Sequence, residues 1–238
     1  MSYLQKSSKN GKIIHMSNLN TNDLVKIGAH YGYTRTRRHP SAKPYINSSL
    51  NGVDFIELSK TSTQFDTAVD FLRSVVAANK QVVFLGTKPE MKQIIKEISL
   101  ATGMPYIADR YIGGAFTNYP QIKKRIEKLH TLLKQKEAGE LAVYTKKEQM
   151  LIQKDIERLD RNFGGLSTLE GLPGALVVID SKKEWMCVDE AIKMRIPVVA
   201  LCNTDCDIKA VDYPIVCNDA APQVARYMLE NLKQVFNK

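Results

Sequence analysis

The sequence has no apolar run long enough to cross a membrane. Hydrophobic residues make up 44% of its 238 residues, but uncharged apolar stretches such as residues 175–179 are far shorter than the roughly 20 residues a transmembrane helix needs. Residues 1–22 lack the apolar core of a secretory signal, so we expect neither a membrane protein nor a secreted one. Four cysteines in a chain of this length do not predict a disulfide framework and favour a reducing compartment.

The common enzyme motifs are also missing. The first strand-to-helix turn carries a single glycine, Gly86, and matches neither dinucleotide- nor P-loop-type phosphate-binding patterns. No G-x-S-x-G nucleophile motif is present. Cys202 and Cys206 form one loose pair, which predicts buried thiols more strongly than a zinc site. The glycine pairs at 113–114 and 164–165 are expected to serve turns and close packing.

Acidic residues follow three predicted strands. Asp180 follows one strand, Asn203, Asp205 and Asp207 follow another, and Asp219 follows a third. Open α/β sheets place ligands at this edge, so a Mg²⁺ site is one interpretation. Capping of helices and turns is the other, and we favour it.

The spacing of apolar residues predicts alternating strands and helices. Capping boxes are predicted at Thr87 and Ser181. This alternation predicts an α/β fold, a three-layer parallel sheet with helices on both faces. The expected strands are residues 53–58, 81–85, 105–108, 175–179, 197–201 and 214–216, and the expected helices are residues 23–27, 65–78, 89–102, 181–194 and 219–236.

Residues 118–163 interrupt the alternation. Two charged segments with narrow apolar stripes, and a capping box at Thr145, predict an antiparallel helical hairpin that protrudes from the sheet. The expected organisation is therefore an α/β domain of residues 22–117 and 164–238, this hairpin insertion, and a flexible basic extension of residues 1–21. Most of the hairpin's charges are expected to be solvated.

The net charge of +9 is unevenly distributed. Residues 1–45 carry a net +7, residues 46–120 are neutral, residues 121–161 carry +4, and residues 162–238 carry −2. A basic arm beside a near-neutral body is typical of proteins that bind polyanions, although a merely solvated tail gives the same composition.

Basic and aromatic residues are interleaved in two segments. Arginine pairs with phosphate through two nitrogens, and aromatic rings stack on unpaired bases. No RNP, KH or helix-turn-helix pattern is present, so we expect recognition of RNA shape and backbone. The candidate RNA-binding residues are Arg35, Arg37, Arg38, His39 and Lys43 in the first segment, and Arg110, Tyr111, Asn118, Lys123, Lys124 and Arg125 in the second.

Seven ordered segments make the chain resemble a known family, the bacterial-type second protein of the small ribosomal subunit. The most specific is Arg-Tyr-Ile-Gly-Gly-Ala-Phe-Thr-Asn at 110–118. The chain departs from the family pattern at Tyr33, where the family usually has His, and at Tyr111, where it usually has Trp. The other matching segments are residues 24–32, 44–46 with 51–52, 84–88, 145–148, 163–165 and 172–180.

The resemblance implies a flavodoxin-like sheet domain with the hairpin, and no catalytic residue, metal or cofactor. It implies a structural constituent of the small ribosomal subunit, a ribonucleoprotein of translation, which binds rRNA near the head–body junction and supports assembly. The implied partners are small-subunit rRNA, neighbouring ribosomal proteins and, in some relatives, the large mRNA-binding ribosomal protein; no membrane or homo-oligomer is expected. Bacterial cytoplasm is the expected location, with an organellar ribosome as the alternative.

Two other function classes stay open from the residues alone. One is an α/β enzyme that uses the acidic strand-end edge with Mg²⁺. The other is a free α/β protein whose hairpin binds a partner helix.

Overall fold

A five-stranded parallel sheet forms the centre of the molecule. The computed structural model describes residues 19–236, so most of the extension predicted for residues 1–21 lies outside the described residues. The strand order is β5-β4-β6-β7-β8, which in chain order is the 2-1-3-4-5 arrangement of flavodoxin-like sheets. The strands are β4 (Val82–Leu85), β5 (Tyr106–Ile107), β6 (Ala175–Ile179), β7 (Val198–Cys202) and β8 (Tyr213–Val216).

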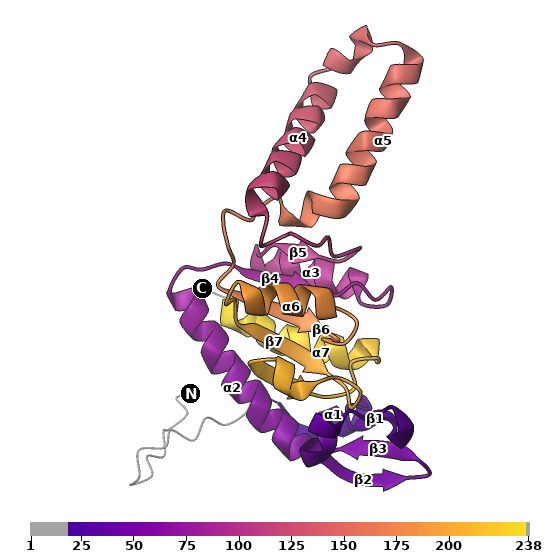
Figure 1. The fold of residues 1–238 in the computed structure, drawn as a ribbon, viewed down its shortest axis with the longest axis vertical. Coiled ribbons are helices and arrows are strands. Elements are labelled where there is room, and N and C mark those ends of the chain that lie inside the picture. The colour runs from indigo at the N-terminus through magenta and orange to yellow at the C-terminus, as the bar shows by residue number, and fades with distance from the viewer. Residues whose placement is uncertain (1–18, 237–238) are drawn as a thin grey trace, which may run out of the picture.

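Helices cover both faces of this sheet, as predicted (Figure 1). Helices α2 (Leu58–Ala77), α3 (Lys92–Thr102) and α7 (Pro222–Lys233) pack on one face, and α6 (Trp185–Lys193) packs on the other. Alternate strand residues serve the two cores: Val177 belongs to the first apolar cluster, while Val178 belongs to the second. Every residue of β4, β6 and β7 is buried, as expected for a sheet covered on both faces.

A second, antiparallel sheet precedes the main one. Its order is β1-β3-β2, with β1 at Tyr31–Thr34, β2 at Ile46–Leu50 and β3 at Val53–Ile56. Of these strands only β3 was expected, at residues 53–58, and β1 and β2 are additional to the prediction. Asn51 and Gly52, both with positive φ, make the tight turn between β2 and β3, the geometry that a two-residue hairpin requires.

Helix α4 (Tyr119–Glu137) runs away from the sheet, and helix α5 (Lys146–Phe163) runs back toward it (Figure 1). Their apolar residues nearest the sheet, such as Ile122 and Phe163, join the core under α6. Farther out, Lys128 of α4 pairs with Asp155 of α5 at 2.6 Å. No helix among residues 19–236 is long and apolar enough to cross a membrane.

One of the three predicted capping boxes forms as expected. Thr145 and Glu148 cap α5 reciprocally. The capping boxes predicted at Thr87 and Ser181 do not form. Instead, Thr87 from the first binds Glu184 from the second: the amide and hydroxyl of Thr87 donate to Glu184 Oε1 at 3.1 and 2.5 Å. Helices α3 and α6 consequently begin at Lys92 and Trp185 without a side-chain cap.

Gly165 allows the turn after α5 to lie directly against β5. A Cβ at this position would collide with the backbone oxygen and ring of Tyr106, whereas a Cβ at Gly171 would meet nothing within 4 Å. We expect Gly165→Ala to lower the free energy of unfolding by about 1–3 kcal/mol, the usual cost of forcing extra volume into a packed site. Urea denaturation with Gly171→Ala as the matched control checks this; equal midpoints for the two variants would contradict it.

Candidate nucleic-acid interface

The first basic segment is fixed to the end of β7 by Thr204. Tyr33 donates its amide hydrogen to Thr204 Oγ1 at 2.9 Å, and His39 donates its own to the Thr204 carbonyl at 2.8 Å. Gly32 permits this close approach, because a Cβ there would lie 2.6 Å from Thr204 Cγ2. The segment is therefore ordered by the fold before any ligand arrives.

Two of the predicted arginines have partners inside the protein. Arg38 Nε lies 3.3 Å from Oδ2 of Asp54, and these side chains are 19% and 0% exposed. A buried carboxylate without a cation would be costly, so this pair is structural. Arg37 is more exposed; its guanidinium lies 4.3 Å from the centre of the Tyr33 ring and 3.4 Å from Asp205 Oδ2.

His39 is also held from several directions. Its Nδ1 lies 2.7 Å from Ser41 Oγ, accepts the Ser41 amide, and is 3.7 Å from Asp207. Arg35 and Lys43, in contrast, are exposed, and no ion pair involves either within residues 19–236. These two cations are free to contact a polyanion.

The second segment forms a loop that wraps around one buried carboxylate, Glu190 of α6. The carboxylate accepts hydrogen bonds from the Tyr111 hydroxyl at 2.6 Å and from three loop amides at 2.7–2.8 Å. The Thr117 hydroxyl donates a fifth at 2.9 Å. Burial by itself would raise the pKa of Glu190, but these hydrogen bonds lower it to about 2. The amide donors are Gly114, Phe116 and Thr117.

This loop presents the predicted cations at the base of α4. Tyr111 is buried and its hydroxyl is engaged, so it orders the loop and does not offer a surface for base stacking. Arg110 and Asn118 are exposed. So are Lys123, Lys124 and Arg125 on the first turns of α4, and among the described residues no ion pair involves them.

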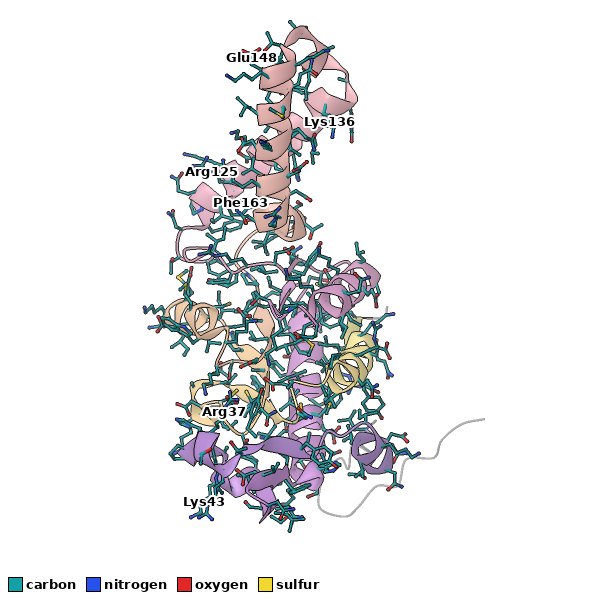
Figure 2. All side chains as sticks on the ribbon, turned by 90° about the vertical axis from the view of Figure 1, so that its right-hand side faces the viewer. Arg37, Lys43, Arg125, Lys136, Glu148 and Phe163 are labelled. Atoms are coloured by element: carbon teal, nitrogen blue, oxygen red, sulfur yellow. The ribbon has the colours of Figure 1, made fainter. Side chains whose placement is uncertain are left out.

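The two basic segments lie at opposite ends of the sheet (Figure 2). Arg37 and Lys43 lie at the end that carries the antiparallel sheet, and Arg125 lies where α4 leaves the parallel sheet. We name the first the loop surface (Arg35, Arg37, Lys43) and the second the helix-base surface (Arg110, Asn118, Lys123, Lys124, Arg125).

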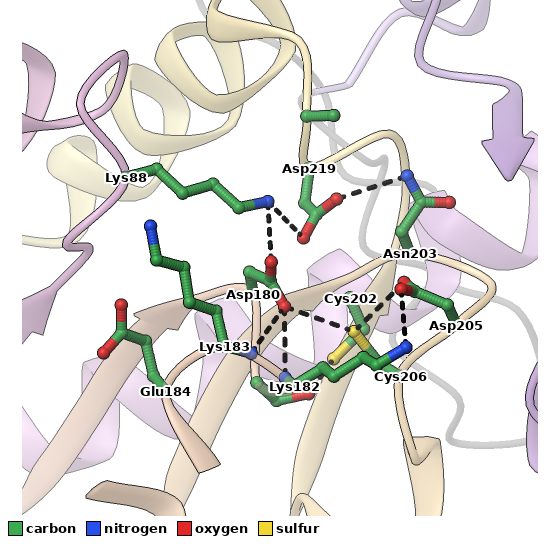
Figure 3. A network of polar contacts seen from close by, with 12 residues as sticks. Lys88, Asp180, Lys182, Lys183, Glu184, Cys202, Asn203, Asp205, Cys206 and Asp219 are labelled. Atoms are coloured by element: carbon green, nitrogen blue, oxygen red, sulfur yellow. Dashed lines mark hydrogen bonds and ion pairs between the residues drawn. The ribbon is translucent and has the colours of Figure 1, made fainter. Parts of the chain in front are cut away.

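The acidic strand-end residues form a charged network at the carboxyl edge of the sheet (Figure 3). Lys88 Nζ lies 2.7 Å from Asp180 Oδ2 and 3.2 Å from Asp219 Oδ2. Asn203 donates to the other Asp219 oxygen at 3.2 Å. Burial and the nearby Asp180 raise the pKa of Asp219 to about 6, although Lys88 and Asn203 act in the opposite direction.

The same residues are the described group best placed to hold a metal ion. Ligand atoms of Asp180, Cys206 and Asp219 lie within 4.8 Å of one another. The Lys88 ammonium, however, is bound between the two carboxylates and supplies the positive charge that they need. Asp180 Oδ1 also accepts the amides of Lys182 and Lys183 at 3.1 and 3.0 Å. Asp180 thus caps a turn, as the favoured interpretation predicted, whereas its ion pair with Lys88 was not predicted.

All four cysteines are free and buried, as predicted. The residues that sequence reasoning missed are the internal partners: Asp54, Lys88, Glu190 and Thr204. Only Glu190 had a detectable signal, because it falls on the apolar face of its helix beside Cys187 and Ala191, where a charge needs a partner.

Comparison with known proteins identifies the family. The sequence pattern of ribosomal protein S2 matches residues 24–238. The chain is 39% identical over 206 residues to the small ribosomal subunit protein uS2 of Chloroflexus aurantiacus, covering 87% of both chains. It is 40% identical over 198 residues to the uS2 of a Roseiflexus species, covering 83% of this chain and 76% of the relative.

The family match thus defines the class of protein, a structural protein of the small ribosomal subunit and not an enzyme. The chain belongs to the ribosomal protein S2 family. The resemblance inferred from the sequence is confirmed.

Glu190 is the residue on which the helix-base loop depends. Glu190→Gln places an NH₂ group against amide and hydroxyl donors, so several buried donors lose their acceptor. We expect a loss of roughly 2–4 kcal/mol in the free energy of unfolding, with faster amide exchange at 114–117. Asp189→Asn is the matched control, since Asp189 is exposed and pairs with Lys193 one turn on; such pairs contribute about 0–1 kcal/mol. Equal stability of the two variants would refute this role.

Asp219 predicts a specific pH dependence. Its pKa is raised in the folded state, so the folded protein holds the proton more tightly and protonated Asp219 adds to the free energy of unfolding. This added stability is fully present below about pH 3.8 and is lost as the pH rises through about 6. Asp219→Asn should therefore flatten the change in stability between pH 4 and 6, by on the order of 2 kcal/mol. Urea midpoints at both pH values measure this, with Asp23→Asn, whose carboxylate pairs with exposed Lys26, as control. An unchanged pH difference in Asp219→Asn would contradict it.

Proposed function

We propose that the loop surface and the helix-base surface bind small-subunit rRNA through its phosphates. One observation carries this proposal: Arg35, Lys43, Arg110 and the cations of the first α4 turns are exposed, and no ion pair involves them within residues 19–236. By contrast, Arg38 and Lys88 form ion pairs with carboxylates inside the protein. A protein whose basic side chains are paired internally would offer little to a polyanion.

The separation of the two surfaces supports a bridging role. They lie at opposite ends of the sheet (Figure 2), so one RNA strand segment cannot satisfy both. A rigid sheet with an RNA surface at each end holds two RNA elements at a fixed distance. This arrangement fits the proposed place near the junction of head and body, where the subunit's two RNA masses meet.

The helices α4 and α5 belong to this proposal as a projecting hairpin, an insertion of residues 118–163 in the α/β domain. Four Lys and Arg in excess of acids in residues 121–161 give it a basic character. The proposed setting is the bacterial cytoplasm, and the bacterial origin of the named relatives supports it. The other proposed partners are neighbouring small-subunit proteins, the large mRNA-binding ribosomal protein among them, with no homo-oligomer.

Within the predicted site, roles divide by burial. Arg35, Arg37 and Lys43 contact phosphates at one surface, as do Arg110 and the α4 cations at the other. Arg38, His39 and Tyr111 are positioning residues, because the protein itself occupies their polar atoms. Replacing Arg35, Arg37 and Arg38 together by alanine would therefore mix lost RNA contacts with a broken Arg38–Asp54 ion pair.

A cleaner test removes only free cations. Arg35→Ala with Lys43→Ala should weaken binding of the full chain to a small-subunit rRNA transcript roughly tenfold near physiological salt and reduce the log–log salt slope by about 1–2. Filter binding across a salt series measures both. Lys80→Ala with Lys209→Ala removes the same charge from other exposed positions and should change neither quantity.

The helix-base surface is tested in the same way with Lys123→Ala, Lys124→Ala and Arg125→Ala. Sucrose-gradient sedimentation then shows how much of each variant enters small subunits. If both sets of variants assemble and bind at elevated salt as well as the Lys80/Lys209 control does, these surfaces do not contact RNA.

A further inference from the structure

An apolar groove runs along the exposed side of α6. Its volume is about 500 Å³, and its floor is formed by Trp185, Val188 and Ile192 of α6 with Ala210 from the loop after β7. The groove is separate from both basic surfaces' free cations. Trp185 is the chain's single tryptophan.

The apolar residues of α6 in the groove have the spacing found in helices that bind a partner through one face. Trp185 and Ile192 are 62% and 52% exposed, and with Val188 between them they form an i, i+3, i+7 stripe, the pattern of anchors that bind in grooves. Exposed tryptophans are enriched at sites that dominate binding energy. Isolated exposed apolar residues need no explanation, but a concave group of this kind marks an interaction site.

The rim of the groove carries carboxylates on both walls. Asp189 lies on α6 and Asp207 on the opposite loop. Asp189 pairs with the exposed Lys193 at 2.7 Å, and Asp207 lies 3.7 Å from Nδ1 of His39. Exposed pairs of this kind are weak, so both carboxylates can accept a further cation.

We propose that this groove binds a segment of a neighbouring small-subunit protein that carries a large apolar side chain and an adjacent lysine or arginine. The apolar side chain fills the space between Trp185 and Ile192, and the cation pairs with Asp189 and Asp207. RNA fits poorly, because phosphates would face these carboxylates and an apolar floor. Residues 162–238, which include both walls of the groove, carry a net −2, and this sign complements a basic protein segment.

Asp205 connects the groove to the loop surface. Its Oδ2 is 3.0 Å from Lys182 Nζ on the groove's rim and 3.4 Å from Arg37 Nη2. A partner in the groove therefore lies beside the residues proposed to bind RNA. The inference rests on the chain's place in the small subunit and adds a protein contact to it.

Photo-crosslinking tests the proposal in the assembled particle. The full chain with p-benzoylphenylalanine in place of Ile192 is expressed as the only copy, and small subunits are isolated on a sucrose gradient. The control carries the same group in place of Leu100, which is 79% exposed on α3, a helix of the other sheet face. Sedimentation of both derivatives with small subunits reports on the proposed function separately from the groove.

The expected result is a crosslink from position 192 to one ribosomal protein, at a peptide that contains an apolar residue next to lysine or arginine, and several times stronger than any crosslink from position 100. Asp189→Lys should reduce it severalfold, while Asp23→Lys should not. A crosslink only to rRNA, to this chain itself, or at the level of the control overturns the proposal, as does insensitivity to Asp189→Lys. Mass spectrometry of the crosslinked peptides decides among these outcomes.

Discussion

Burial of the central sheet on both faces is the constraint from which the other features follow. Because every residue of β4, β6 and β7 is buried, polar groups border this core in the loops at the strand ends and on the helices that cover the sheet. Charges at these borders are partly desolvated and must find partners nearby. Lys88 between Asp180 and Asp219, and Glu190 under the helix-base loop, are both solutions to this one problem.

The same constraint explains which elements the sequence predicts well. Residues 175–179 are an unbroken apolar run and form β6 with the predicted bounds. Helix α2 begins at Leu58 instead of residue 65, because its first turns are polar and half-exposed and show no apolar stripe. The strand predicted at residues 53–58 forms as β3, but its neighbour β2 escapes prediction for a related reason. It is exposed over almost its whole length, so its side chains do not alternate between core and solvent.

For the candidate site, sequence reasoning locates the cations but not their availability. Arg37 and Arg38 are neighbours in the chain and similar in chemistry, yet one lies mostly in solvent and the other pairs with a fully buried aspartate. The partner of Tyr111 is 79 residues away, on α6. Such pairings depend on the strand order, and no local pattern encodes them. A count of basic residues in the sequence therefore overestimates how many cations are available to RNA, because it includes residues such as Arg38 that form ion pairs inside the protein.

The internal pairs also determine how rigidly the free cations are presented. Thr204 holds the loop surface through the amides of Tyr33 and His39, and Glu190 holds the helix-base loop through three amides. Both anchors are attached to elements of one sheet, β7 through its following loop and α6 through its packing. The proposed phosphate contacts at either end would then cost little ordering of the backbone, since folding has already fixed it. Thr204 and Glu190 thus attach the two distant basic surfaces to the same sheet domain.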